Sequence, residues 1–160
     1  MTNMAPRNVD SAYPARLSEH PDLESGCAAR VPRVLLAEDD DDLRLGLTAL
    51  LRFDGYDVYA VADGTSLLDK LASRLLSQEL ATPVDVIVTD VRMPGVNGLA
   101  IVEGLRADGW AQPVVLISAF GDDEVRARVE RLESVVFLAK PFEPAALERV
   151  LADLTDLTDA

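Results

Sequence analysis

Five polar side chains directly follow apolar segments that have the length of β-strands. They are Glu38, Asp39, Asp90, Ser118 and Lys140. Three carboxylates that converge in one crevice repel each other strongly unless a cation or a proton is shared among them. Magnesium resolves this conflict, because it prefers a few carboxylate oxygens and fills its other positions with water, backbone carbonyl and phosphoryl oxygens. We therefore expect Asp39 and Asp90 to bind Mg²⁺ directly and Glu38 to act through a water molecule.

The same side chains suit the handling of a phosphoryl group. Asp90, as a carboxylate, needs no general base to act as a nucleophile, and its attack would form an acyl phosphate. The metal would offset the charge on the phosphoryl oxygens, while Ser118 and Lys140 would hold those oxygens in place. Either residue alone is a weak indication, because hydroxyls and lysines also end strands incidentally. Their combination with the acids, at the ends of different strands, favours the functional interpretation.

The acids that follow the first pair have a simpler explanation. Asp40, Asp41 and Asp42 open a helical pattern, and negative charge is favourable at a helix N-terminus without any ligand. We predict that Asp41 points into solvent from the first helical turn. The only histidine, His20, lies in a polar N-terminal segment, which makes it a poor candidate for a catalytic triad.

Apolar runs of strand length alternate with helical patterns from Val31 onwards. The predicted strands are Val34–Ala37, Asp57–Val61, Val84–Thr89, Val114–Ile117 and Val135–Ala139. A helix is predicted after each strand, from apolar residues that recur at helical spacing, and the fourth of these covers Asp122–Leu132. Gly55 is the expected stop of the first helix, Asp63 the cap of the second, and Pro144 a first helical position.

Five βα units in about 130 residues predict the α/β class, with a parallel sheet that carries helices on both faces. The first, third and fourth strands are the most continuously apolar, so they should be central. Asp57 and Tyr59 interrupt the second strand, which should lie at an edge. Functional groups in such a sheet gather outside the carboxyl ends of the strands, where the strand order reverses. We therefore expect the five polar side chains to meet there.

Composition narrows the class of protein. The chain has 160 residues, 49% of them hydrophobic, and a formal net charge of −13, which suits one globular domain with a short extra segment. Its acidity argues against direct binding of nucleic acid or of an anionic membrane surface. The single cysteine, Cys27, excludes an internal disulfide and a zinc site built from cysteines, which fits a reducing cytoplasm. Neither a membrane span nor a signal peptide is indicated.

The folded domain is expected to occupy residues 31–156. Residues 1–30 contain three of the nine prolines and no sustained periodicity of either kind. They predict a flexible N-terminal tail.

Four sequence motifs resemble the receiver domain of two-component response regulators. They are Val34-Leu35-Leu36-Ala37-Glu38-Asp39, Val88-Thr89-Asp90-Val91-Arg92-Met93-Pro94-Gly95, Leu116-Ile117-Ser118-Ala119 and Ala139-Lys140-Pro141-Phe142. Each motif alone is weak to moderate, but four in the right order and spacing are highly specific. The resemblance covers about Arg33–Leu154. It implies the flavodoxin-like receiver fold, a doubly wound five-stranded parallel sheet in the order 2-1-3-4-5.

The resemblance also implies a role for each residue of the acidic site. Asp90 would be the phospho-acceptor. Glu38 and Asp39 would be the acidic pair, with Asp39 the main ligand of Mg²⁺. The backbone carbonyl of Arg92 would be a further ligand of the metal.

Further roles concern the response to phosphorylation. The resemblance makes Ser118 the switch hydroxyl, Phe137 the aromatic switch residue and Lys140 the lysine of the site, with a cis peptide before Pro141. Phenylalanine stands where tyrosine is more frequent, which removes a hydroxyl from the switch. Glu133-Ser134 stands where many family members have a Gly-Ala pair, so the loop before the fifth strand is expected to be atypical.

A phospho-accepting regulator is the function that these motifs imply. A histidine kinase or a histidine phosphotransfer protein would supply the phosphoryl group, and the chain's own catalysis would be limited to weak self-phosphorylation and dephosphorylation. Only about six residues follow the last predicted helix. We therefore expect a single-domain cytoplasmic regulator that acts by contact with a downstream protein. Family members often also form homodimers through the fourth helix, fifth strand and fifth helix.

Two other classes of protein share parts of this pattern. A magnesium-dependent phosphohydrolase with an aspartate nucleophile would use an Asp-x-Asp arrangement, which Asp39-Asp40-Asp41 imitates, but no cap insertion is evident to enclose a substrate. A flavodoxin-like flavin carrier would need a phosphate loop rich in glycine and hydroxyls after the first strand. A row of acids there repels phosphate.

Overall fold

The computed structural model describes residues 30–76, 83–119 and 122–156, in which strands and helices alternate along the chain. The elements are β1 (Arg33–Ala37), α1 (Asp41–Phe53), β2 (Asp57–Val61), α2 (Gly64–Leu76), β3 (Val86–Asp90), α3 (Gly98–Ala107), β4 (Val114–Ala119), α4 (Asp123–Val129), β5 (Val135–Lys140) and α5 (Pro144–Asp156). All of them belong to the unit that starts at Val31. The tail predicted over residues 1–30 falls, except for Arg30, outside the described residues.

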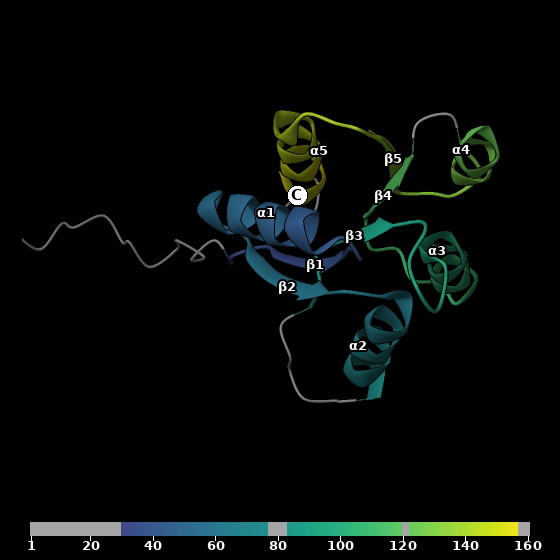
Figure 1. Cartoon of the computed structure of the whole chain (residues 1–160). Helices are drawn as coiled ribbons and strands as arrows, with labels where there is room; N and C mark the ends of the chain where they lie inside the picture. The colour runs from purple at the N-terminus through teal and green to yellow at the C-terminus, as the bar shows by residue number, and fades with distance from the viewer. Residues whose placement is uncertain (1–29, 77–82, 120–121, 157–160) are drawn as a thin grey trace, which may run out of the picture. The chain divides into compact units, whose positions relative to one another are not determined.

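The five strands form one parallel sheet in the order β2-β1-β3-β4-β5 (Figure 1). The predicted α/β class and the strand order are therefore confirmed. β1, β3 and β4 are central, and β2 is an edge strand. The order reverses between β1 and β3, so the carboxyl ends of these two strands flank the crevice in which such sheets bind ligands.

Helices cover both faces of the sheet (Figure 1). Alternate residues of a strand point to opposite faces. On β1, Val34 and Leu36 join the core under α1 and α5, whereas Leu35 and Ala37 join the core under α2, α3 and α4. Both faces of β1 and β3 are buried. This explains why the two strands read as unbroken apolar runs.

The helix boundaries follow local signals in the sequence. Asp40 caps α1 by accepting a hydrogen bond from the backbone of Leu43 at 2.9 Å. Gly55 lies beyond the end of α1 at φ +95°, a conformation that L side chains rarely adopt. Asp63 accepts from the backbone N–H of Ser66 at 2.7 Å before α2, and α5 begins at Pro144. The predicted stop, cap and start residues are confirmed.

The boundaries differ from the predicted ones by up to three residues: β3, for example, begins at Val86 rather than Val84, and β4 ends at Ala119 rather than Ile117. Two of the differences have a local cause. β3 runs to Asp90 because this residue still pairs with Ile117 of β4. α4 ends at Val129 rather than Leu132, because the N–H of Leu132 bonds to the carbonyl of Val129, three residues back, and tightens the final turn. Ser134 then takes φ +55° before β5. A glycine would adopt this conformation without strain, which makes the loop before β5 unusual, as expected.

No helix in the described part of the chain combines the length and the apolar character that crossing a bilayer would require.

Candidate functional site

Three of the predicted acids lie together at the carboxyl end of the sheet. Glu38 and Asp39 follow β1, and Asp90 ends β3. One carboxylate oxygen from each lies within 4.8 Å of the other two. Glu38 is fully buried and Asp90 nearly so, whereas Asp39 is exposed. The cluster is thus open to solvent on the side of Asp39.

Lys140 brings the fifth strand into this cluster. Its Nζ donates to Asp90 Oδ2 at 2.5 Å and to Glu38 Oε2 at 3.0 Å. β5 is separated from β3 by β4, yet the side chain reaches across because it extends from the last residue of its strand. The peptide bond between Lys140 and Pro141 is cis, as the resemblance implied. The ammonium therefore offsets part of the charge of the two buried carboxylates.

Burial and hydrogen bonding act in opposite directions on these groups. Burial raises the pKa of Glu38, and the hydrogen bonds from Lys140 and from the backbone of Asp40 only partly lower it. Burial disfavours the ammonium of Lys140, but its hydrogen bonds to Asp90 and Glu38 outweigh that effect and raise its pKa. The carboxylates that Lys140 contacts thus stabilise its charged form.

The loop after β3 is packed closely against Asp90. The backbone N–H of Arg92 donates to Asp90 Oδ1 at 3.0 Å and fixes the carboxylate. Gly98, at the start of α3, lies so near that a Cβ there would come within 2.1 Å of the carbonyl oxygen of Asp90. Only glycine permits this approach. The chain thus holds Asp90 through its own loop and leaves Oδ2 for Lys140.

Ser118 lies one residue before the end of β4 and is 1% exposed. Its hydroxyl is 3.2 Å from Asp122 Oδ2, and no hydrogen bond joins it to Asp90 among those of the described residues. Asp122 also pairs with the Arg92 guanidinium at 3.1 Å and caps α4. From the sequence, Asp122 is predicted only as the start of a helix. An acid three residues before Val125 signals such a cap, but not the contact with Ser118.

Phe137 is half-buried in the middle of β5. It packs against the core under α2, α3 and α4. The guanidinium of Arg126, on α4, lies over its ring at 5.1 Å from the centroid. This distance is within the range of a cation–π contact. Phe137 has no hydroxyl, and its ring face contacts a cation.

The donor set fits a hard divalent cation. Glu38, Asp39 and Asp90 offer carboxylate oxygens, which Mg²⁺ prefers to nitrogen or sulfur ligands. Asp41, by contrast, is exposed and pairs with Arg44 on the surface of α1. It lies apart from the three-acid cluster, as its predicted position in the first helical turn requires.

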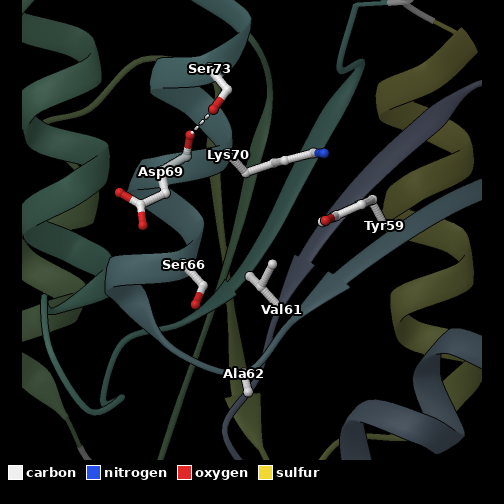
Figure 2. A pocket seen from close by; sticks show the side chains of 7 residues that line it. All are labelled: Tyr59, Val61, Ala62, Ser66, Asp69, Lys70 and Ser73. Atoms are coloured by element: carbon white, nitrogen blue, oxygen red, sulfur yellow. Dashed lines mark hydrogen bonds between the residues drawn. The ribbon is translucent and has the colours of Figure 1, made fainter.

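A separate hollow of about 430 Å³ lies between the edge strand β2 and α2. Figure 2 shows Lys70 extending from α2 toward Tyr59 of β2, with the ammonium 3.7 Å from the ring centroid. Ser73 donates to the backbone carbonyl of Asp69 on the same helix. None of the predicted site residues lines this hollow. Lys70, the other lysine of the chain, is therefore a natural control for Lys140.

The chain is similar in sequence to known proteins of one family. The profile of the response regulator receiver domain matches residues 34–152. The transcriptional activator protein PfeR of Pseudomonas aeruginosa is 35% identical over 117 residues, which cover 73% of this chain and 35% of PfeR. The response regulator MprA of Mycobacterium avium is 35% identical over 127 residues, which cover 78% of this chain and 50% of MprA. The chain thus spans half or less of the length of these relatives.

Solved structures show the same fold. The receiver domain of the Francisella response regulator 1452 superposes with a TM-score of 0.68 at 25% identity, covering 79% of this chain and 98% of that domain. The chemotaxis response regulator CheY4 of Vibrio cholerae gives a TM-score of 0.63 at 25% identity, over 78% of this chain and 99% of CheY4.

Proposed function

The chain belongs to the response regulator receiver domain family, and from this premise we propose that Asp90 accepts a phosphoryl group from a phosphohistidine of a partner protein. Members of this family are signalling modules of two-component systems rather than dedicated enzymes. The observation that carries the assignment is the position of Asp90, whose carboxylate lies beside two other acids and accepts a hydrogen bond from Lys140. The phosphohydrolase alternative has no support from these relatives.

The proposed transfer is an in-line substitution at phosphorus. A carboxylate oxygen of Asp90 attacks, the bond between phosphorus and the histidine nitrogen breaks, and that nitrogen keeps the electron pair. Asp90 Oδ1 is held by the backbone of Arg92, and Oδ2 by Lys140. Lys140 can then bind a phosphoryl oxygen as a point charge. Slow attack of water on the acyl phosphate would return the carboxylate and release inorganic phosphate.

Mg²⁺ is the cofactor that we propose for this site. Glu38, Asp39 and Asp90, together with the backbone carbonyl of Arg92, would hold the ion, with Asp39 as its main ligand. When bound, it would offset the charge that develops on the phosphoryl oxygens. Asp39 would contact the ion directly, and Glu38 would act through a water molecule. The exposed carboxylate of Asp39 and the buried carboxylate of Glu38 support these two roles.

The proposed response to phosphorylation uses Ser118 and Phe137. Ser118 would bind a phosphoryl oxygen, and the Phe137 ring would move inward into the space that the hydroxyl leaves. A ligand shifts a two-state element only through contacts that differ between the states, and these contacts satisfy that condition. The face formed by α4, β5 and α5 would change its shape for a downstream protein.

The partners follow from the same proposal. A histidine kinase or a phosphotransfer protein would donate the phosphoryl group, and the α4, β5 and α5 face would bind the downstream target or a second copy of the chain. A cytoplasmic location is part of the proposal and is supported by the single cysteine, which suits a reducing compartment. The proposed boundaries are a tail over residues 1–30 and a receiver domain over residues 31–156.

The test is incubation with acetyl phosphate and Mg²⁺, followed by measurement of the intact mass. We expect one phosphoryl group on the parent protein and none on Asp90→Asn. Asp85→Asn is a matched control, because Asp85 precedes β3 and hydrogen-bonds to the backbone of Arg33 at the opposite end of the sheet. Labelling that survives Asp90→Asn unchanged would show that another residue accepts the group.

A further inference from the structure

The start of α4 contacts both residues that the proposed switch uses. Asp122 Oδ2 accepts a hydrogen bond from Ser118, and Arg126 lies over the ring of Phe137. The two residues are one helical turn apart, and the N–H of Arg126 bonds to the carbonyl of Asp122 at 3.0 Å. A single turn of backbone thus connects the hydroxyl of β4 with the ring of β5.

The contact with Ser118 has an energetic consequence. A serine hydroxyl has one proton to donate, and here that proton points to Asp122. The acceptor is a carboxylate oxygen at 3.2 Å, a longer distance than in the strongest hydroxyl–carboxylate hydrogen bonds. The Asp122 side chain is 11% exposed, so water competes poorly for its Oδ2 atom. Ser118 must give up this acceptor before it can donate to a phosphoryl oxygen on Asp90.

Arg92 connects the contact to the acceptor loop. Its backbone N–H holds Asp90 Oδ1, and its guanidinium, on a side chain that is 74% exposed, pairs with the same Oδ2 atom of Asp122 that accepts from Ser118. A phosphoryl group on Asp90 would bring negative charge close to both Arg92 and Asp122. It would attract the guanidinium and repel the carboxylate, and both effects weaken the pair.

We propose that Asp122 and Arg126 hold Ser118 and Phe137 in the arrangement of the unphosphorylated protein, and we call these two residues the latch. Phosphorylation of Asp90 would weaken the latch through the ion pair of Arg92 with Asp122. Asp122 is a positioning residue, because it acts on the phosphoryl group through Ser118. The proposal rests on the proposed roles of Asp90 and Ser118. It predicts that the strength of the latch determines how readily the phosphorylated arrangement forms.

The test measures the dissociation constant of beryllofluoride, a phosphoryl mimic, in the presence of Mg²⁺. Asp122→Asn is the main variant, because asparagine still caps a helix but lacks the charge that binds Ser118 and Arg92. We expect it to bind beryllofluoride about tenfold more tightly than the parent. Asp123→Asn, which removes the neighbouring exposed charge of the same helix turn, should change the constant less than twofold.

The Ser118→Ala variant distinguishes the effect of the latch from repulsion between Asp122 and the negatively charged beryllofluoride. In Ser118→Ala the hydroxyl is gone, so adding Asp122→Asn should tighten binding by no more than threefold. Arg92→Gln offers an independent variant with an intact cap and should tighten binding in the same direction. Amide NMR of β5 should show Phe137 shifted toward the bound position in Arg126→Met before any beryllofluoride is added.

Three results would overturn the latch. One is an unchanged dissociation constant in Asp122→Asn, and another is a tenfold gain that persists in Ser118→Ala, which would indicate repulsion alone. The third is an Arg126→Met spectrum identical to that of the parent. A parent protein that fails to bind beryllofluoride would instead refute the proposed function, and the latch with it.

Discussion

Replacing Lys140 by alanine should leave two buried carboxylates without the cation that they share. The ammonium lies 2.5 Å from Asp90 and 3.0 Å from Glu38. The side chain of Glu38 is 0% exposed and that of Asp90 is 9% exposed, so solvent cannot replace the lost partner well. We therefore expect the substitution to lower the free energy of unfolding of the metal-free protein.

The structure sets the size of this loss. Removing one partner of a buried ion pair costs roughly 3–5 kcal/mol, because it leaves an uncompensated buried charge. The Lys140 side chain is 27% exposed, and partial access of water reduces the cost. We expect a loss of about 2–3 kcal/mol at pH 7. Mg²⁺ should restore most of it, because a cation that binds only the folded state stabilises that state by mass action.

The loss should depend on pH. Burial already raises the pKa of Glu38, and the variant lacks the two contributions of Lys140 that lower it, so the pKa rises further. A carboxyl with a raised pKa in the folded state loses stability as pH rises from its unfolded value through its folded value. The variant should therefore resemble the parent near pH 4.5 and fall behind it by pH 7. Lys140 in the parent, whose pKa is raised, begins to lose its charge only above pH 10.5, so its own titration does not enter the difference between pH 4.5 and pH 7.

Urea unfolding at pH 4.5 and pH 7, with and without Mg²⁺, measures these differences. Lys70→Ala is the control, since its ammonium lies over the exposed ring of Tyr59 and should contribute less than about 1 kcal/mol at either pH. An equal loss in Lys140→Ala at both pH values would refute the electrostatic argument. It would show that Lys140 stabilises the fold through packing of its aliphatic stem.

Three further predictions, two of them with a control variant, test other parts of the structure. In Mg²⁺ titrations, Asp39→Ala should weaken binding at least tenfold and Asp41→Ala less than twofold, because only Asp39 lies in the three-acid cluster; equal effects would indicate a diffuse acidic surface. Ser134→Gly should raise the free energy of unfolding by about 0.5–1 kcal/mol in urea, since φ +55° strains a residue with a Cβ; a loss would contradict this. Arg106→Ala should lower it by about 2 kcal/mol, because the guanidinium donates to four backbone carbonyls, two in the segment before β4 and two in the loop before β5. Arg128→Ala, which removes only a surface pair, should have a smaller effect on the urea midpoint.

The sequence predicted the fold and the strand-end cluster for the same physical reason. Strands that are buried on both faces must be apolar throughout, so a polar residue marks where such a strand leaves the core. Asp90, at the end of β3, is a mark of this kind, whereas Lys140 ends the half-buried edge strand β5. Parallel strands bring their carboxyl ends to one edge, so the prediction that these side chains meet needs only the strand directions. The continuity of the apolar residues in each strand then indicated which strands are central.

Side-chain contacts across loops could not be predicted in this way. Aspartate is a common type of helix cap, and a cap pattern does not indicate that Asp122 also contacts Ser118. Arg106 on α3 reaches the carbonyls of Glu133 and Ser134, almost thirty residues later in the chain. Long side chains have several rotamers of similar energy, and tertiary packing selects among them. Neither contact leaves a pattern in the sequence.

The two kinds of contact differ in how much of the fold they need. Lys140 meets Glu38 across 102 residues and Asp90 across 50, so the acidic site exists only when the strands of the sheet are in place. The contact of Ser118 with Asp122 spans four residues, at the start of a helix that ends after two turns. Segments with few buried contacts rearrange at lower free energy than the core of a sheet. A receiver with this architecture can therefore change its α4 contacts while the site that receives the phosphoryl group stays assembled, which is the condition that a phosphorylation switch must satisfy.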